Sequence, residues 1–162
     1  MKQSSYLQRF AKRALLFVLG IGLAGQLHAQ AKNLEKSGRA LQGYDPVAFF
    51  TEGKPVKGDP NISSKSSGAV YYFASAGHKA AFDKEPAKYE PQFGGYCAYG
   101  VTKGDLVKIE VDAFQIVGGR LLLQYNKDIR DKFNKDKNGN LKTADANWPT
   151  VSKKKPAKGF FE

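Results

Sequence analysis

Three side chains of this chain could hold a metal ion: Cys97, His78 and Asp45. Cys97 is the only cysteine in the sequence, and His78 is one of two histidines, the other being His28. Thiolate and imidazole are soft or borderline donors, which favour copper, whereas magnesium and calcium require several oxygen ligands. If the chain binds a metal, the sequence therefore predicts copper bound by Cys97 with His78 or with a carboxylate such as Asp45.

The same residues also have other interpretations. Cys97 stands between Tyr96 and Ala98 and could be a small buried side chain, while a single histidine on a short helix could simply lie at the surface. A Cys–His pair could also be a nucleophile and its base, although the residues around Cys97 match no cysteine-protease signature. Spacing does not decide whether Cys97 and His78 meet in space.

The N-terminal residues have the organisation of a secretory signal peptide. A basic stretch without acidic residues precedes an apolar run from Ala14 to Ala24. That run is shorter than the ~20 residues of a membrane-spanning helix, so we expect no stable membrane span after processing. Small residues predict cleavage after Ala29, with cleavage after Ala31 as the alternative. We expect a periplasmic or secreted protein. The alternative is that the N-terminal segment is not cleaved and anchors the protein in the membrane.

The chain divides into four segments. Residues 1–29 are the expected signal peptide, and residues 30–42 are polar, lack a sustained hydrophobic period and are expected to form a flexible leader. Residues 43–150 form one expected domain, because a chain of this length normally builds a single core. Residues 151–162 form a basic tail.

The net charge and the single cysteine restrict which partners the protein could bind and how its fold could be stabilised. Removal of the signal takes four of the 26 Lys and Arg residues and none of the 15 acidic residues, which leaves a net charge of +7. The basic residues are not interleaved with aromatic residues, which argues against nucleic acid and leaves an anionic component of the envelope as a partner. A single cysteine excludes an internal disulfide, so core burial must stabilise the domain.

Local patterns predict an α+β fold: a small single domain with short antiparallel strands, a β-hairpin and a few short helices. Gly118-Gly119 separates two apolar segments and predicts the tight turn of that hairpin. Ser75 and Asn126 are expected to cap the helices that follow them, and Gly139 to end the second helix. The expected elements are a strand over 69–75, a helix over 76–84, a hairpin over 114–125 and a helix over 127–135.

Several segments taken in order resemble the YHS domain family, in particular its exported single-domain branch. The matching segments are Gly43-Tyr44-Asp45-Pro46-Val47, Tyr72-Phe73-Ala74-Ser75, Gly94-Gly95-Tyr96-Cys97-Ala98 and the ending Ala144-Asp145-Ala146-Asn147-Trp148-Pro149. The metal-associated members of that family carry three cysteines, and Ala48, Ala74 and His78 stand at the corresponding positions here. Two of the three donors are therefore missing, which weakens the expectation of heavy-metal binding.

The resemblance and the export signal together imply a binding or accessory module of the cell envelope that takes a metal or a small ligand. We expect a monomeric module rather than an enzyme. Two alternatives remain open from the sequence: a thiol-dependent enzyme that uses Cys97, and a partner-binding protein whose association weakens as salt is added.

Overall fold

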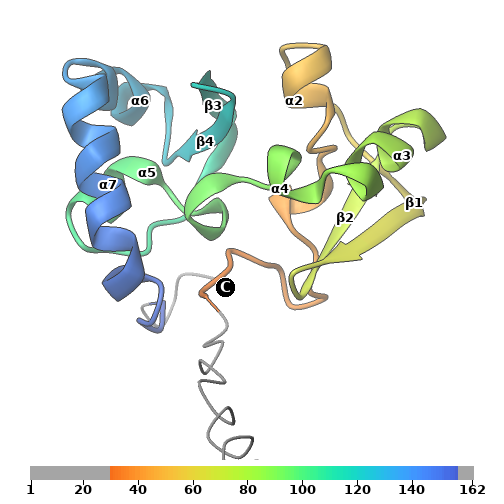
Figure 1. Cartoon of the computed structure of the whole chain (residues 1–162), viewed down its shortest axis with the longest axis horizontal. Coiled ribbons are helices and arrows are strands. Elements are labelled where there is room, and N and C mark those ends of the chain that lie inside the picture. The colour runs from red at the N-terminus through yellow and green to blue at the C-terminus, as the bar shows by residue number, and fades with distance from the viewer. Residues whose placement is uncertain (1–29, 157–162) are drawn as a thin grey trace, which may run out of the picture.

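Two antiparallel β-hairpins and six α-helices make up residues 30–156, the part of the chain that the computed structural model describes (Figure 1). The expected α+β class is confirmed. The expected signal peptide, 1–29, and the end of the basic tail, 157–162, lie outside the described residues. Between residues 30 and 156, no helix is long and apolar enough to cross a membrane. The elements are η1 (Leu41–Gly43), α2 (Ala48–Thr51), β1 (Asp59–Ser66), β2 (Ala69–Phe73), α3 (Ala76–Lys84), α4 (Pro86–Tyr89), η2 (Gln92–Gly95), α5 (Ala98–Thr102), β3 (Glu110–Val117), β4 (Arg120–Gln124), α6 (Lys127–Asn134) and α7 (Lys137–Val151), where η marks a 3₁₀ helix.

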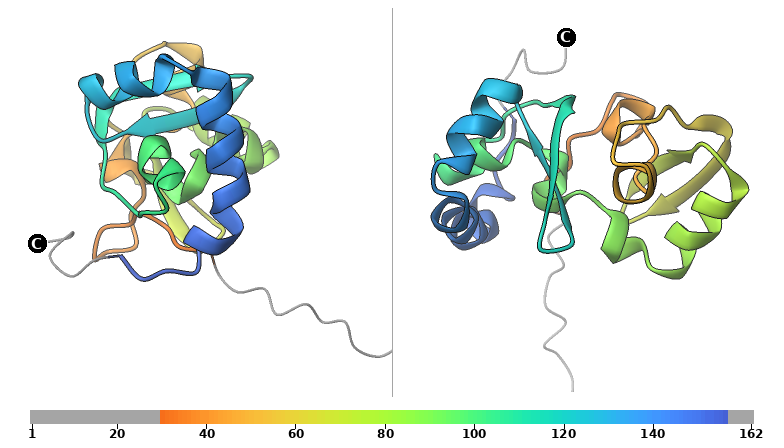
Figure 2. Two further views of the ribbon diagram at one scale, coloured as in Figure 1. Left: turned by 90° about the vertical axis from the view of Figure 1, so that its left-hand side faces the viewer. Right: turned by 90° about the horizontal axis from the view of Figure 1, so that it is seen from above.

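The hairpins lie in two halves that share a core. Figure 1 shows β1 and β2 with α2 and α3 in one half, and β3 and β4 with α5, α6 and α7 in the other; Figure 2 shows the same separation from above. One hydrophobic cluster contains Phe49 and Phe73 from the first half together with Leu121 and Leu123 from the second. The rings of Phe49 and Phe114 meet across the halves with centroids 4.8 Å apart. The first half therefore depends on the second for its packing.

The two halves repeat one local arrangement, beginning with a tight left-handed turn. The three residues Leu41–Gly43 all have positive φ, and so do the three residues Phe93–Gly95. A tyrosine follows each turn, and then comes Asp45 in the first half and Cys97 in the second. The positive φ values explain the glycines that end both turns, because that conformation strains residues with a Cβ.

The hairpins of the two halves share an irregularity as well as their antiparallel pairing. In the first, the register shifts between Asp59 and Ser63, and in the second it shifts between Glu110 and Phe114. A helix capped by the side chain of its preceding polar residue follows each hairpin. The two halves are thus equivalent over turn, hairpin and helix.

The N-terminal caps of α3 and α6 show which residues of the two halves occupy equivalent positions. Ser75 Oγ accepts a hydrogen bond from His78 N at 3.1 Å, and Asn126 Oδ1 accepts one from Ile129 N at 2.9 Å. Both expected caps are confirmed, as are α3 over the expected 76–84 and the hairpin turn at Gly118-Gly119. Ile129 therefore stands in the second half where His78 stands in the first.

Two local expectations were wrong. The expected elements did not include β1, but its segment forms a strand because β2 supplies its backbone partners and leaves its polar side chains largely facing water. Gly139 was expected to end a helix, but it lies in the first turn of α7, where its N–H donates to Asp136 Oδ1 at 3.0 Å. The cap at Asp136 outweighs the helix-ending tendency of glycine.

The expected leader and tail also differ from the structure. Ala40 and Leu41 are buried in the core, so the packed region begins before residue 43. Val151 and Ser152, at the start of the expected tail, are buried as well. Ala31 N donates to Ser152 O at 2.8 Å, which joins the two ends of the described chain. Backbone hydrogen bonds to distant residues, which local polarity does not reveal, hold the leader in place.

Candidate functional site

Asp45 is a fully buried carboxylate at the centre of the first half. Its Oδ1 accepts hydrogen bonds from Val47 N at 2.8 Å and Ala48 N at 3.4 Å, and its Oδ2 accepts one from Ala74 N at 2.8 Å. Pro46 presets the backbone for the turn into α2 and has no N–H of its own to satisfy. Asp45 therefore ties the start of α2 to the end of β2.

Within residues 30–156, His78 is the side-chain partner of this carboxylate. Its Nδ1 lies 2.7 Å from Asp45 Oδ2, and its side chain is 21% exposed. An ionised carboxylate only accepts hydrogen bonds, so we assign the proton of the neutral imidazole to Nδ1, which leaves the lone pair on Nε2. Within residues 30–156, Nε2 has no hydrogen-bond partner. The pair thus presents an oriented imidazole nitrogen.

Cys97 is buried in the shared core. Its thiol donates to Gln124 Oε1 at 3.3 Å, and its sulfur accepts from Gly100 N at 3.4 Å. Burial raises the pKa of the Cys97 thiol, which keeps the sulfur protonated and lowers its reactivity. These contacts are those of a structural cysteine.

The structure brings two of the three candidate ligands together. Asp45 and His78 are in contact, whereas Cys97 bonds to Gln124. Both oxygens of Asp45 are already engaged by backbone N–H groups. In the described part of the chain, no three His, Cys, Asp or Glu side chains converge on a possible metal position. Copper binding through these residues stays a prediction.

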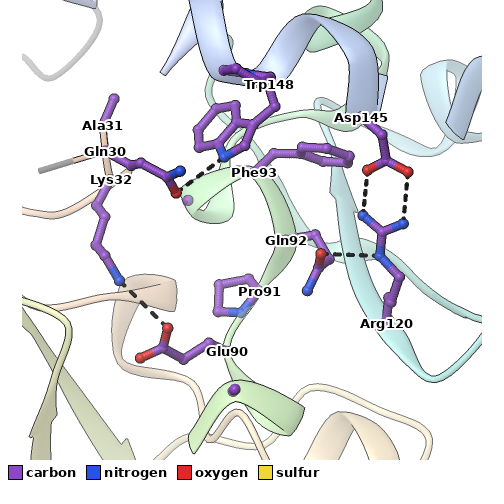
Figure 3. A pocket seen from close by; sticks show the side chains of 13 residues that line it. Gln30, Ala31, Lys32, Glu90, Pro91, Gln92, Phe93, Arg120, Asp145 and Trp148 are labelled. Carbon is purple, nitrogen blue, oxygen red and sulfur yellow. Dashed lines mark hydrogen bonds and ion pairs between the residues drawn. The ribbon is translucent and has the colours of Figure 1, made fainter. Parts of the chain in front are cut away.

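A cavity of about 300 Å³ lies between the N-terminal segment, the turn before α5 and the end of α7 (Figure 3). No local sequence pattern predicts this cavity, because its walls come from segments far apart in the chain. The polar and aromatic side chains that line it include Gln30, Lys32, Glu90, Gln92, Phe93, Arg120, Asp145 and Trp148.

Arg120 is held rigidly at one side of the cavity. Its Nη1 and Nη2 donate to the two oxygens of Asp145 at 2.9 and 2.6 Å, and its Nε donates to Gln92 Oε1 at 3.0 Å. The hydrogen bonds to Asp145 raise the pKa of the Arg120 guanidinium above its ordinary value. A forked pair of this kind fixes the orientation of both side chains. The amide NH₂ of Gln92 carries no bond in the described part.

Lys32 and Glu90 form a looser pair on the opposite side. Lys32 Nζ lies 3.6 Å from Glu90 Oε2, and each side chain is 19% exposed. The other oxygen, Glu90 Oε1, is buried and has no hydrogen-bond partner in the described part. The pKa of Tyr71 is raised, mainly by burial and further by the charge of Glu90. Glu90 is thus a carboxylate whose bonding capacity is incompletely used.

Aromatic rings make one wall of the cavity. Trp148, the only tryptophan of the chain, meets Phe93 edge to face with centroids 5.8 Å apart. The Trp148 indole Nε1–H donates to Gln30 Oε1 at 3.2 Å. Figure 3 shows the indole and Gln30 at the same end of the cavity, opposite Glu90.

The N-terminal segment is fitted closely against this wall. Asn33 N donates to Gly94 O at 2.8 Å, and Tyr96 Oη donates to Lys32 O at 3.1 Å. A Cβ at Gly94 would collide with the carbonyl oxygen of Ala31, and Gly94 also has a φ of +59°. Glycine is therefore required there both for the turn and for the approach of residues 30–33. The Gly94-Gly95 pair was the one sequence signal for this contact.

Comparison of the chain with protein-family models, with curated proteins and with solved structures finds no match.

Proposed function

We propose that this chain is an exported accessory module of the cell envelope that binds a small ligand in the cavity of Figure 3 and does not catalyse a reaction. The observation that carries the proposal is the cavity itself, with a rigid Arg120–Asp145–Gln92 group on one side and an incompletely bonded Glu90 on the other. Export rests on the signal-like N-terminus, and the family assignment rests on the YHS-like segments.

The cavity has the properties of a small-molecule site. Its volume is at the lower end of the range of about 300–1,000 Å³ for ligand sites, and it combines aromatic walls with a few placed polar groups. Hydrogen bonds hold several of those groups in position before any ligand arrives. Such preorganisation lowers the entropic cost of binding.

Trp148 provides the test, because a single tryptophan gives fluorescence from one known place. We expect saturable changes in its emission when the exported protein is titrated with a panel of sugars, amino acids, nucleosides and short carboxylic acids. Lys32→Gln should weaken binding, whereas Lys36→Gln, on an exposed lysine outside the cavity, should leave it unchanged. Failure of every probe, or equal effects of the two variants, would contradict the proposal.

The Asp45–His78 pair supports a second candidate function, the binding of a copper ion. A carboxylate bonded to one imidazole nitrogen is the usual support of a histidine that holds a metal through the other. The donor is then His78 Nε2 alone, so affinity would be modest. Copper uptake by the purified protein should fall with His78→Ala and persist with Cys97→Ser; uptake unchanged by His78→Ala would rule this candidate out.

A further inference from the structure

We infer that the ligand of this cavity is an uncharged, hydroxyl-rich ring, that is, a single sugar unit; the inference rests on the proposed function of the cavity. Three features of the lining carry it: the balance of charges, the mixture of free donors and acceptors, and the aromatic wall.

The charged side chains of the lining cancel one another. Lys32 and Arg120 are positive, Glu90 and Asp145 are negative, and each cation is paired with one of the acids. Among the side chains of the lining, a charged ligand would have to separate one of these pairs or remain without a counter-ion. The cost is greater for Lys32 and Glu90, each 19% exposed, because a poorly hydrated charge that loses its partner is unfavourable. The lining therefore fits an uncharged ligand.

The lining keeps both hydrogen-bond donors and hydrogen-bond acceptors that a ligand could use. The Gln92 amide NH₂ is a free donor, because only its carbonyl oxygen is used by Arg120. Glu90 Oε2 is an acceptor and Lys32 Nζ is a donor, and the only contact between them is 3.6 Å long, which is beyond a hydrogen bond. A hydroxyl group donates and accepts at once, so a ligand with several hydroxyls can use all three side chains.

The aromatic wall adds apolar ring surface. Trp148 and Phe93 lie edge to face at one end of the cavity, with the polar groups around them. A sugar ring has an apolar face made of C–H groups and an edge made of hydroxyls. It can therefore lie against the rings and reach Gln92 and Glu90 with its edge. The small volume suits one ring rather than a chain of them.

Three sugars that share one ring and differ at a single substituent test the inference: glucose, which is neutral, glucosamine, with an ammonium group at C2, and glucuronate, with a carboxylate at C6. N-Acetylglucosamine adds a second neutral probe, and phenylalanine is a zwitterion with an aromatic ring. Binding to the full exported protein is measured by calorimetry and by Trp148 fluorescence. We expect the neutral sugars to bind at least tenfold more tightly than the charged ones and the zwitterion.

Variants connect that preference to the cavity. Glu90→Gln and Gln92→Ala should each weaken the neutral sugars by tenfold or more, while Lys36→Gln should change nothing; thermal unfolding checks that each variant is folded. Tighter binding of a charged probe or of phenylalanine, abolished by Gln92→Ala, would overturn the sugar assignment and leave the proposed function standing. If no sugar binds, the assignment fails, and the wider ligand panel then decides whether the cavity binds small molecules at all.

Discussion

Cys97 occupies in the second half of the protein the position that Asp45 occupies in the first. Each follows a left-handed turn and a tyrosine, and each backbone N–H donates to a valine carbonyl, Val56 at 2.8 Å or Val107 at 2.9 Å. Asp45 accepts from the backbone N–H after β2, and the Cys97 thiol donates to Gln124, the last residue of β4. A carboxylate and a thiol thus connect the same elements.

The repeated arrangement of turn, hairpin and helix does not require Asp45 or His78. The second half forms its turn, hairpin and helix without a charge at this position and with Ile129 in place of His78. The charge of Asp45 and its contact with His78 are therefore additions to the shared arrangement. This is why the pair is retained as a candidate site although Cys97 is not.

Replacement of Asp45 should be far more damaging than replacement of its partner. Asp45→Ala removes the acceptor of three backbone N–H groups, two of them buried and that of Ala74 part-buried, and should lower the free energy of unfolding by about 2–4 kcal/mol. His78→Ala leaves those bonds intact and should cost about 1 kcal/mol or less, because the imidazole is partly exposed. Urea denaturation measures both, with the exposed Asp131→Ala as control. Equal losses for the two variants would contradict the assigned role of Asp45.

The Cys97 thiol should not react in the native protein. It is buried, it is hydrogen-bonded to Gln124, and its pKa is raised by burial. Titration with a thiol reagent near pH 8 should therefore show no rapid modification until a denaturant is added. Immediate reaction of the folded protein would favour the thiol-dependent enzyme that the sequence left open.

Stability should fall at alkaline pH. The pKa of Tyr96 is raised by burial to about 12, and the pKa values of Tyr71 and Cys97 are raised as well. Between about pH 10 and 12 the unfolded chain loses its phenol protons while the folded chain keeps that of Tyr96, so protons favour the folded state. This contribution is fully present below pH 10 and is lost as pH approaches 12. Chemical denaturation across this range should show the decline, and Tyr96→Phe should make it shallower; an unchanged slope would contradict the buried phenol.

Two glycines with nearly the same backbone conformation test the docking of the N-terminal segment. Gly94 and Gly118 have φ values of +59° and +57°, but only Gly94 has a neighbour, Ala31 O, where a Cβ would lie. Both replacements by alanine should cost about 1 kcal/mol for the positive φ. Gly94→Ala should cost more and should also change Trp148 fluorescence, because it displaces residues 30–33. Equal stabilities and unchanged fluorescence would show that the segment is not held there.

Elements with local signals could be predicted from the sequence, whereas the cavity could not. Helices α3 and α6 carry their own caps in Ser75 and Asn126, and the second hairpin carries its turn in Gly118-Gly119. Strand β1 has no apolar alternation, and only pairing with β2 makes it a strand.

In the candidate sites, too, residue types could be predicted from the sequence but contacts between distant residues could not. The Asp45–His78 contact joins residues 33 positions apart, and the cavity joins residues 30–32 to Arg120 and Trp148. No local pattern connects such distant residues, so neither arrangement could be deduced from spacing. The residue types at Asp45, His78 and Cys97 could be recognised, but their distances could not.

The most direct test of the cavity as a ligand site is the NMR signal of one hydrogen. Trp148 is the only tryptophan, so a ¹H–¹⁵N spectrum contains one indole N–H peak, and that N–H lies at the cavity beside Gln30. We predict that a neutral sugar moves this peak saturably, together with the side-chain amide of Gln92, and that the shift disappears in Gln92→Ala but not in Lys36→Gln. Saturable binding that leaves the indole peak in place, or a peak that no ligand of the panel moves, would contradict the account.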